Sequence, residues 1–95
     1  MKYLDWSDEK NEWLKKERGV SFEQVELAME SGDLLDRIKH PNPERYPGQK
    51  IFMVRIAGYV FAVPFVEDDE KIFLKTIIPD RKATRKYLGG KNEKN

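Results

Sequence analysis

Apolar side chains recur with two different spacings along this chain, and the spacing changes near residue 50. Between Ser21 and Gly32 the apolar residues lie three or four positions apart, which is typical of one face of an α-helix. From Ile51 onward they form nearly continuous runs of strand-favouring residues, separated by short polar turns. The pattern therefore predicts helices in the first third of the chain and a sheet in the second half.

Two helices are predicted near the start of the sequence. Ser7 can cap the first helix, whose first turn carries acidic residues, and Gly19 can end it. Ser21 and Gln24 have the spacing of a capping box for the second helix, which stops at Gly32. The residues of these helices that we expect to face the core are Trp13, Leu14, Phe22, Val25, Ala28 and Met29.

One strand is predicted before the first helix and four after the second. These strands are expected at residues 2–5, 34–39, 51–57, 59–66 and 71–78. Three prolines within residues 40–49 make that segment a loop. Residues 59–66 are apolar on both sides, as expected of the central strand in an antiparallel meander, and Pro64 is expected to produce a bulge. The predicted fold class is α+β.

A short helix with only cations on its exposed side is predicted after Pro79. Asp80 can cap this helix, and Gly89 and Gly90 can end it. A cation in the first turn opposes the helix dipole at a cost of up to about 1 kcal/mol, so an anionic partner explains the cations better than folding does. A solvated basic terminus is the alternative interpretation. The cations on the exposed side are Arg81, Lys82, Arg85 and Lys86.

The net charge of this 95-residue chain is only +1, but the charge is unevenly distributed. Residues 1–33 contain five Lys/Arg and nine Asp/Glu, whereas residues 71–95 contain eight Lys/Arg and two Asp/Glu. A local positive field of this kind attracts nucleic acid or an acidic peptide.

Length and composition limit the classes of function. We expect one domain over residues 1–90 and a disordered tail at residues 91–95. The chain has no cysteine and one histidine, His40, which excludes thiolate and multi-histidine metal sites, and we expect no metal and no cofactor. No apolar run has the length of a signal peptide or a membrane span, so a cytoplasmic protein without membrane contact is expected.

Two segments resemble parts of BrnT-type toxins. The segment DWSDEKNEWLKKERGVSFEQV is similar to the family's opening, which has a Trp-Asp pair, a Lys-Asn helix, a basic Gly-Val turn and a Ser-Phe-Glu helix start. The segment IIPDRKATRKYL is similar to the family's closing Ile-Ile-x-x-Arg-Lys-Ala-Thr pattern. Together the two segments cover about a third of the chain. The chain differs from the family in two places. It has Lys16, Glu17, Arg18 and Gly19 where the family usually has a Lys-His-Gly turn, and the order Trp6-Ser7-Asp8 replaces the commoner Trp-Asp-Glu.

The resemblance implies a toxin of a type II toxin–antitoxin pair with a RelE/ParE-like fold. It implies a ribonuclease that stops translation and is neutralised by a cognate DNA-binding antitoxin, so the toxin would contact DNA only through that antitoxin. RelE-like ribonucleases tend to use clustered Arg, Lys and sometimes Tyr around the scissile phosphate, without a standard pair of histidines. This sequence is compatible with that chemistry.

Attack of a 2′-OH on the neighbouring phosphate requires a proton acceptor, cations for the phosphorane and a proton donor for the leaving oxygen. Arg81 and Arg85 lie one helical turn apart, and we expect them to give bidentate hydrogen bonds to one phosphate. His40 and Tyr87 are the candidates for proton transfer. Alternatively, His40 is a solvated loop residue, and Tyr87 packs the last helix on the sheet.

Four further cations are expected to bind RNA. For Arg55 and Lys75, which interrupt apolar strands, an equally supported alternative is an exposed sheet face paired with acids such as Glu67 or Asp69. The expected RNA-binding residues are Lys82, Lys86, Arg55 and Lys75.

Two other classes of function remain open at this point. The basic helix is also what a non-catalytic RNA- or DNA-binding module would use. A protein-interaction domain that receives an acidic partner on its basic segment is the third class, and a cognate antitoxin would satisfy it without excluding the first.

Overall fold

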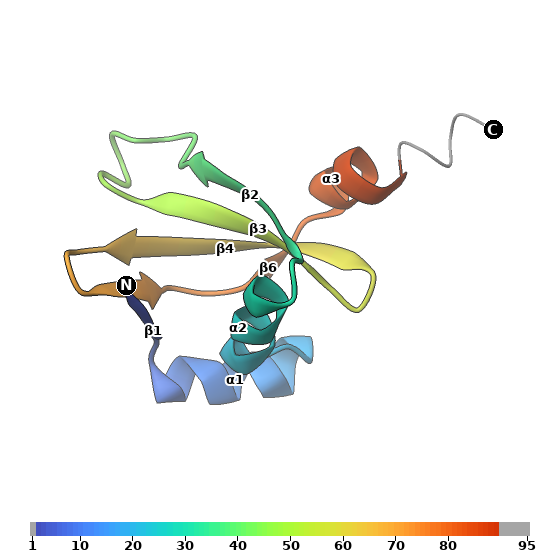
Figure 1. The fold of residues 1–95 in the computed structure, drawn as a ribbon, viewed down its shortest axis with the longest axis horizontal. Helices are drawn as coiled ribbons and strands as arrows, with labels where there is room; N and C mark the ends of the chain where they lie inside the picture. Colours follow the sequence, from blue (N-terminus) through green and yellow to red (C-terminus); the bar gives the residue numbers. More distant parts are fainter. Residues whose placement is uncertain (1, 90–95) are drawn as a thin grey trace.

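Five strands lie in the order β1-β5-β4-β3-β2 in the computed structural model, which describes residues 2–89 (Figure 1). The strands are β1 (Tyr3–Asp5), β2 (Leu34–Lys39), β3 (Lys50–Ile56), β4 (Tyr59–Glu67) and β5 (Lys71–Leu74). A short sixth strand, β6 (Ile78–Pro79), also pairs with β4. The strands from β2 to β5 form an antiparallel meander, and β1 adds to β5 in parallel. The sheet is therefore mixed, and the predicted α+β class is confirmed.

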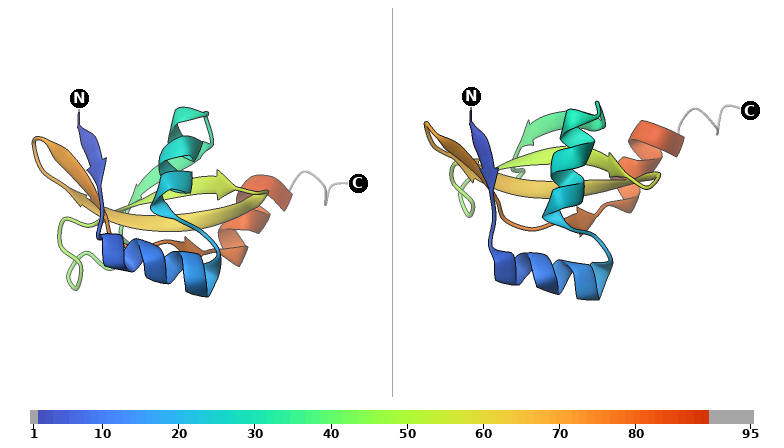
Figure 2. Two further views of the ribbon diagram at one scale, coloured as in Figure 1. Left: turned by 90° about the horizontal axis from the view of Figure 1, so that it is seen from below. Right: turned by 60° about the horizontal axis from the view of Figure 1, so that its bottom comes forward.

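Helices cover both faces of the sheet. The first two helices, α1 (Asp8–Arg18) and α2 (Phe22–Glu30), pack on one face, and α3 (Arg81–Thr84) packs on the other. A π-helical turn, η1 (Arg85–Gly89), continues α3. In both views of Figure 2, α1 lies below the sheet and α3 lies beside its right-hand end.

The caps of α1 and α2 are those predicted from the sequence. The Ser7 side chain accepts a hydrogen bond from the Lys10 backbone N–H, and Gly19 ends α1 with a left-handed φ of 69°. Ser21 and Gln24 form a complete capping box at the start of α2. These caps fix both ends of the connection between the two helices, which is why α2 can begin so soon after α1 ends.

The core between these helices and the sheet contains the apolar residues that the alternation predicts. In β3, Phe52, Val54 and Ile56 face α1 and α2, while Met53 faces the other way. Phe52 stacks on Phe65 of β4, with ring centroids 3.9 Å apart. β4 is central in the sheet, and its residues 60–65 are buried on both faces, as predicted.

The prediction that Trp13 faces the core is wrong. Trp13 is 43% exposed, whereas Leu14 is fully buried. α1 presents Asn11 and Leu14 to the core, three positions apart, and Trp13 falls outside that stripe. Trp6, which precedes the helix, packs on the core instead, with its ring 5.5 Å from that of Phe22.

Two expectations about the strands also fail. The pairing of β3 with β4 continues past Pro64 without a shift, so no bulge forms there, and residues 71–78 divide into β5 and β6 rather than forming one strand. Lys75 donates its backbone N–H to the Pro64 carbonyl at 2.8 Å. The nitrogen and carbonyl of one strand residue point to the same side, so the missing N–H of Pro64 faces the break between β5 and β6. A register shift occurs instead between Leu34 and Asp36 in β2.

The terminal helix is regular only over its first four residues, before the π-helical turn begins. Gly90, predicted as a possible helix end, and the predicted tail at residues 91–95 lie outside the described residues. None of the described helices combines the length and hydropathy needed to cross a bilayer.

Candidate nucleic-acid interface

α3 is attached to β4 by a cap and by hydrogen bonds across the chain. The Asp80 carboxylate accepts the Ala83 backbone N–H at 2.9 Å, and the Asp80 backbone N–H donates to the Val60 carbonyl at 3.0 Å. The Val60 N–H donates in turn to the Thr84 hydroxyl oxygen at 2.9 Å. Ala83, only 6% exposed, lets the helix approach the sheet closely. The sheet therefore fixes the orientation of the basic helix.

The four cations of the last helix are all exposed, as predicted. None of them forms a salt bridge with another residue in the part of the chain that the structure describes. Lys86 places its ammonium 5.2 Å from the centre of the Tyr87 ring. The surface formed by Arg81, Lys82, Arg85 and Lys86, here called the cationic face, thus has no salt bridge to the described residues, although the Asp36 and Asp80 carboxylates line the pocket next to it.

A shallow pocket of about 190 Å³ lies between the cationic face and the sheet. Ile38, Met53 and Ala83 give it an apolar floor, and Lys82 and Lys86 stand at its rim. Asp36, Asp80 and Tyr87 complete its lining. An apolar floor beside ammonium groups suits a ligand with a flat ring and an adjacent anionic group.

Tyr87 lies in this pocket, but its hydroxyl is already engaged. It donates to the Asp36 carboxylate at 2.8 Å. This hydrogen bond raises the pKa of the Tyr87 phenol, because ionisation would bring two anions together. The same bond, followed by one from the Arg37 backbone N–H, lowers the pKa of Asp36. Tyr87 also packs against the second, smaller core cluster, which is the packing role that its spacing from Ala83 had suggested.

Asp36 was not predicted as a site residue, since its partner lies 51 positions away in the sequence. A signal for it exists in the alternation of β2. Asp36 and Ile38 point to the same side of the strand, where Ile38 and Met53 line the apolar floor. A carboxylate on an apolar face of a strand usually has a specific polar partner.

Arg55 and Lys75 differ in their surroundings. Arg55 binds the Asp33 carboxylate through Nη2 at 2.7 Å and Nε at 3.2 Å, and its backbone N–H binds the Asp33 carbonyl. The alternative of pairing with an acid therefore holds for Arg55, although the acid is neither Glu67 nor Asp69. Lys75 is exposed and has no salt bridge within residues 2–89. Lys75 stays available to an anion, whereas Arg55 would first have to leave Asp33.

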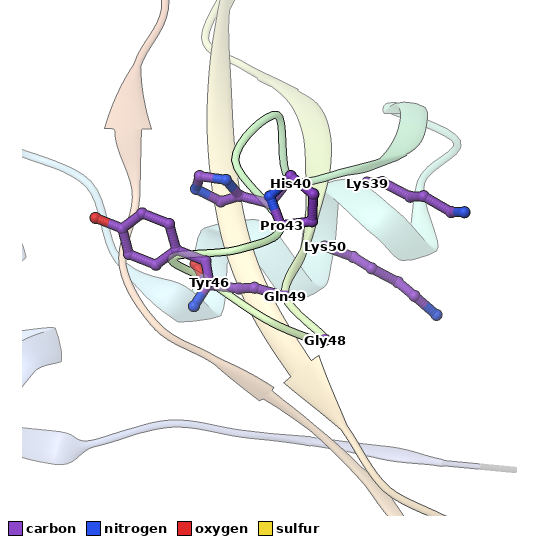
Figure 3. Close-up of a pocket in the computed structure, with 7 residues that line it drawn as sticks. All are labelled: Lys39, His40, Pro43, Tyr46, Gly48, Gln49 and Lys50. Atoms are coloured by element: carbon purple, nitrogen blue, oxygen red, sulfur yellow. The ribbon is translucent and has the colours of Figure 1, made fainter.

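His40 lies in the loop between β2 and β3, apart from the cationic face. It lines a second pocket with Tyr46, and none of the residues around this pocket also lines the pocket beside Tyr87 (Figure 3). His40 lies four positions beyond Asp36, directly after the end of β2, a span of about 13 Å. The structure thus brings Tyr87 close to Lys82 and Lys86 but does not bring His40 to them.

Arg18 makes a contact that the sequence analysis did not anticipate. Its Nη1 donates to the Ile77 carbonyl at 2.6 Å, 59 positions along the chain. Its guanidinium also lies 5.1 Å from the Trp13 ring. Arg18 therefore ties the end of α1 to the segment that leads into α3.

Within residues 2–89, no three side chains of His, Cys, Asp or Glu gather as a metal site would require. Comparisons with models of protein families, with curated proteins and with solved structures gave no significant match.

Proposed function

We propose that this chain is a BrnT-type ribonuclease toxin with a RelE/ParE-like fold, which cleaves RNA without a metal by 2′-OH attack and inhibits translation. The observation that carries the proposal is the cationic face: four exposed cations on one short helix, none with an acidic partner among the described residues. The cations of the first turn oppose the helix dipole, and a phosphate backbone supplies anions for the whole face.

The residues divide the chemistry between them. Arg81 and Arg85 hold the scissile phosphate and stabilise the charge that develops on its oxygens. Lys82 and Lys86 bind neighbouring phosphates, and Lys75 extends the basic surface. Tyr87 protonates the leaving oxygen only after it has released Asp36, which then becomes available as a proton acceptor. Substrate binding in this scheme has to break the Tyr87–Asp36 hydrogen bond.

The partners follow from the same surface. A cognate DNA-binding antitoxin would place Asp and Glu side chains against Arg81, Lys82 and Arg85, and inhibition would compete with RNA binding. The toxin would act in the cytoplasm and reach DNA only through the antitoxin. Purified toxin should bind RNA, and the toxin–antitoxin complex should not; a complex that keeps full RNA affinity would show that the antitoxin covers another surface.

Growth of bacteria that express the chain tests the proposal. Induction should arrest growth, and Arg81→Ala combined with Arg85→Ala should abolish the arrest without changing the fold, because both side chains are exposed. Lys15→Ala combined with Lys16→Ala is the matched control, since it removes two exposed cations from α1 and should leave the arrest intact. Undiminished arrest by the folded arginine variant would remove these arginines from the mechanism.

The products of cleavage test the chemistry. Cleavage of RNA by the purified chain should survive EDTA and leave 2′,3′-cyclic phosphate or 3′-phosphate ends, because an internal 2′-OH needs no metal-activated water. Inhibition by the chelator, or ends that carry 3′-OH, would identify a metal-dependent nuclease instead.

A non-catalytic RNA-binding module is the second candidate, and one observation favours it. The Tyr87 hydroxyl is bound to Asp36 and His40 lies in another pocket, so neither proton-transfer candidate stands free beside the arginines. Such a module would bind RNA through the cationic face and leave it intact. Gel analysis of an end-labelled RNA after incubation with the chain separates the two functions.

A further inference from the structure

The loop between β2 and β3 forms a pocket of about 190 Å³ that the proposed chemistry does not use (Figure 3). Backbone hydrogen bonds hold the loop in shape. The His40 N–H donates to the Gln49 carbonyl at 3.1 Å, the Gln49 N–H to the Tyr46 carbonyl at 3.2 Å, and the Tyr46 N–H to the Asn42 carbonyl at 3.0 Å. The pocket is therefore preformed and needs little ordering when a ligand binds.

Two aromatic rings define one side of this pocket. The rings of His40 and Tyr46 lie 4.3 Å apart at 31°, and Tyr46 is 37% exposed. The His40 Nδ1 accepts the Asn42 backbone N–H at 3.0 Å, so the ring proton lies on Nε2, where it can be donated to a ligand. An accessible ring with a hydrogen-bond donor beside it is the usual platform for an unpaired nucleobase.

Two lysines lie on the other side of the pocket, and their side chains extend away from the rings in Figure 3. Lys39 and Lys50 are register partners on β2 and β3, and their side chains extend the same way in Figure 3. Lys50 is fixed by the Glu67 carboxylate at 2.9 Å, and Arg37 binds the same carboxylate. Lys39 has no salt bridge to any residue between Lys2 and Gly89, so its charge remains for an anion.

The size of the pocket limits the kinds of ligand that can fit it. Sites for whole small molecules usually measure about 300–1,000 Å³, so about 190 Å³ is enough for one planar ring and little more. An acidic peptide would use the lysines but not the aromatic rings. A single nucleotide uses both kinds of group, with its base on the Tyr46 ring and its phosphate on Lys39.

The position of the loop connects this pocket to the cationic face. The loop follows β2 at one end, and Asp36 within β2 binds Tyr87 beside the cationic face. β2 is the last strand in the sheet order, so its outer edge has no neighbouring strand among the described residues. A single strand of RNA a few nucleotides long can follow this edge from one pocket to the other.

We infer that the β2–β3 loop is a second binding site for single-stranded RNA, which takes one nucleotide by stacking its base on the exposed part of the Tyr46 ring, donating a hydrogen bond to it from His40 Nε2 and binding its phosphate with Lys39. The choice of RNA as the ligand rests on the proposed function. The loop positions a strand whose phosphates, a few nucleotides further along the edge of β2, reach Lys82 and Lys86 at the pocket beside Tyr87.

His40 is the chain's single histidine, so its ring signals in an NMR spectrum are a direct reporter of the pocket. Titration of the full chain with a short oligoadenylate should shift these signals to saturation. The shift should be lost in Tyr46→Ala and kept in Tyr3→Ala, which removes an exposed ring from β1 at the opposite edge of the sheet. Unmoved His40 signals at saturating oligoadenylate, or an equal shift with an acidic peptide, would overturn the inference.

Binding measurements provide the second test. Tyr46→Ala should weaken binding of single-stranded RNA about tenfold, as expected for the loss of one stacked base, and Tyr46→Phe should restore most of it. Lys39→Gln should weaken binding severalfold, and Lys16→Gln, an exposed lysine on α1, should not. Full affinity in folded Tyr46→Ala would refute the loop site even if the chain cleaves RNA. Loop-dependent binding without cleavage would instead refute the ribonuclease proposal alone.

Discussion

The two faces of the sheet differ in what they bury and in what they expose. The face toward α1 and α2 holds the main core, in which Leu14, Phe22 and Phe65 are completely buried. The face toward α3 holds a smaller cluster around Met53 and Ala83, with a charged rim. The first face supplies most of the apolar burial that stabilises the fold, so the second can carry exposed positive charge at little risk to the structure.

Polar groups follow the same division. On the α1 side, Asn11 is only 3% exposed, and both ends of its amide are bonded. On the α3 side, the hydrogen bond between Tyr87 and Asp36 lies at the surface. A buried polar contact must stay closed for the protein to remain folded, whereas an exposed one can open for a ligand.

The largest difference in stability is expected between two substitutions, one on each face of the sheet. Phe65→Ala should lower the free energy of unfolding by about 3–5 kcal/mol, because it leaves a cavity next to Phe52. Leu88→Ala removes a half-buried side chain from the smaller cluster and should cost about 1 kcal/mol. Urea denaturation measures both values, and equal losses would show that the two faces share the stability.

The next largest loss of stability is expected from a substitution of Asn11. Asn11→Ala should cost about 1–3 kcal/mol, because the amide oxygen that accepts the Phe22 backbone N–H at 2.8 Å would be lost and that donor is buried. Asn42→Ala, in the exposed loop, serves as the control and should change the unfolding free energy by less than about 0.5 kcal/mol. Thermal unfolding of the two variants should differ accordingly; a small effect at Asn11 would mean that water replaces its bonds.

The lowered pKa of Glu67 predicts that the stability of the protein depends on pH. Hydrogen bonds from Lys2 and Lys50 lower its pKa from 4.5 to about 2. A carboxyl whose pKa is depressed by folding stabilises the protein above the unfolded pKa, so this contribution should be full above about pH 4.5 and disappear as the pH falls toward about 2. Because the cluster lies near the surface, roughly 1 kcal/mol is expected near neutrality.

Urea denaturation at several pH values measures this contribution as the difference between the wild-type chain and Glu67→Gln. Glu70→Gln, at an exposed position in the following turn, is the control. A difference that does not change between pH 5 and pH 2 would contradict the low pKa of Glu67.

The smallest effect is expected at Tyr87. Tyr87→Phe should change the unfolding midpoint less than Glu67→Gln does, since its hydrogen bond is exposed. The phenol should ionise above its ordinary pKa near 10, because Asp36 accepts its proton in a hydrogen bond, and Asp36→Asn should bring the pKa back down. Absorbance of tyrosinate against pH, compared with Tyr87→Phe, measures this shift; an unchanged curve in Asp36→Asn would show that the hydrogen bond does not form in solution.

Local sequence signals predicted most of the fold. The caps at Ser7 and Ser21, the alternation in β3 and the apolar central strand all depend on neighbouring residues, and all are present. The errors concern longer-range packing. Trp13 is a large apolar residue of the kind usually found in a core, but the direction of α1 decides its exposure. The break after β5 depends on Pro64, which lies in another strand.

The candidate site was only partly predictable for the same reason. The cationic face was visible because its four residues lie within six positions of one another, on α3 and the π-helical turn that continues it. The Tyr87–Asp36 pair, the contact between Arg18 and Ile77, and the loop pocket around Tyr46 join residues whose proximity only the fold creates. A sequence pattern shows which residues share a helix face, but not which strand that face will meet.

The parallel pairing of β1 with β5 affects the order in which the nascent chain can fold. Tyr3 pairs with Lys71, so the first strand leaves the ribosome long before its partner is made. α1 and α2 likewise emerge before the β3–β4 hairpin on which they pack, and the charged helix follows the entire sheet. Under the proposed function, a half-translated chain would be harmless to the ribosome that makes it, because the surface that attacks RNA forms only after β4 has emerged to support it.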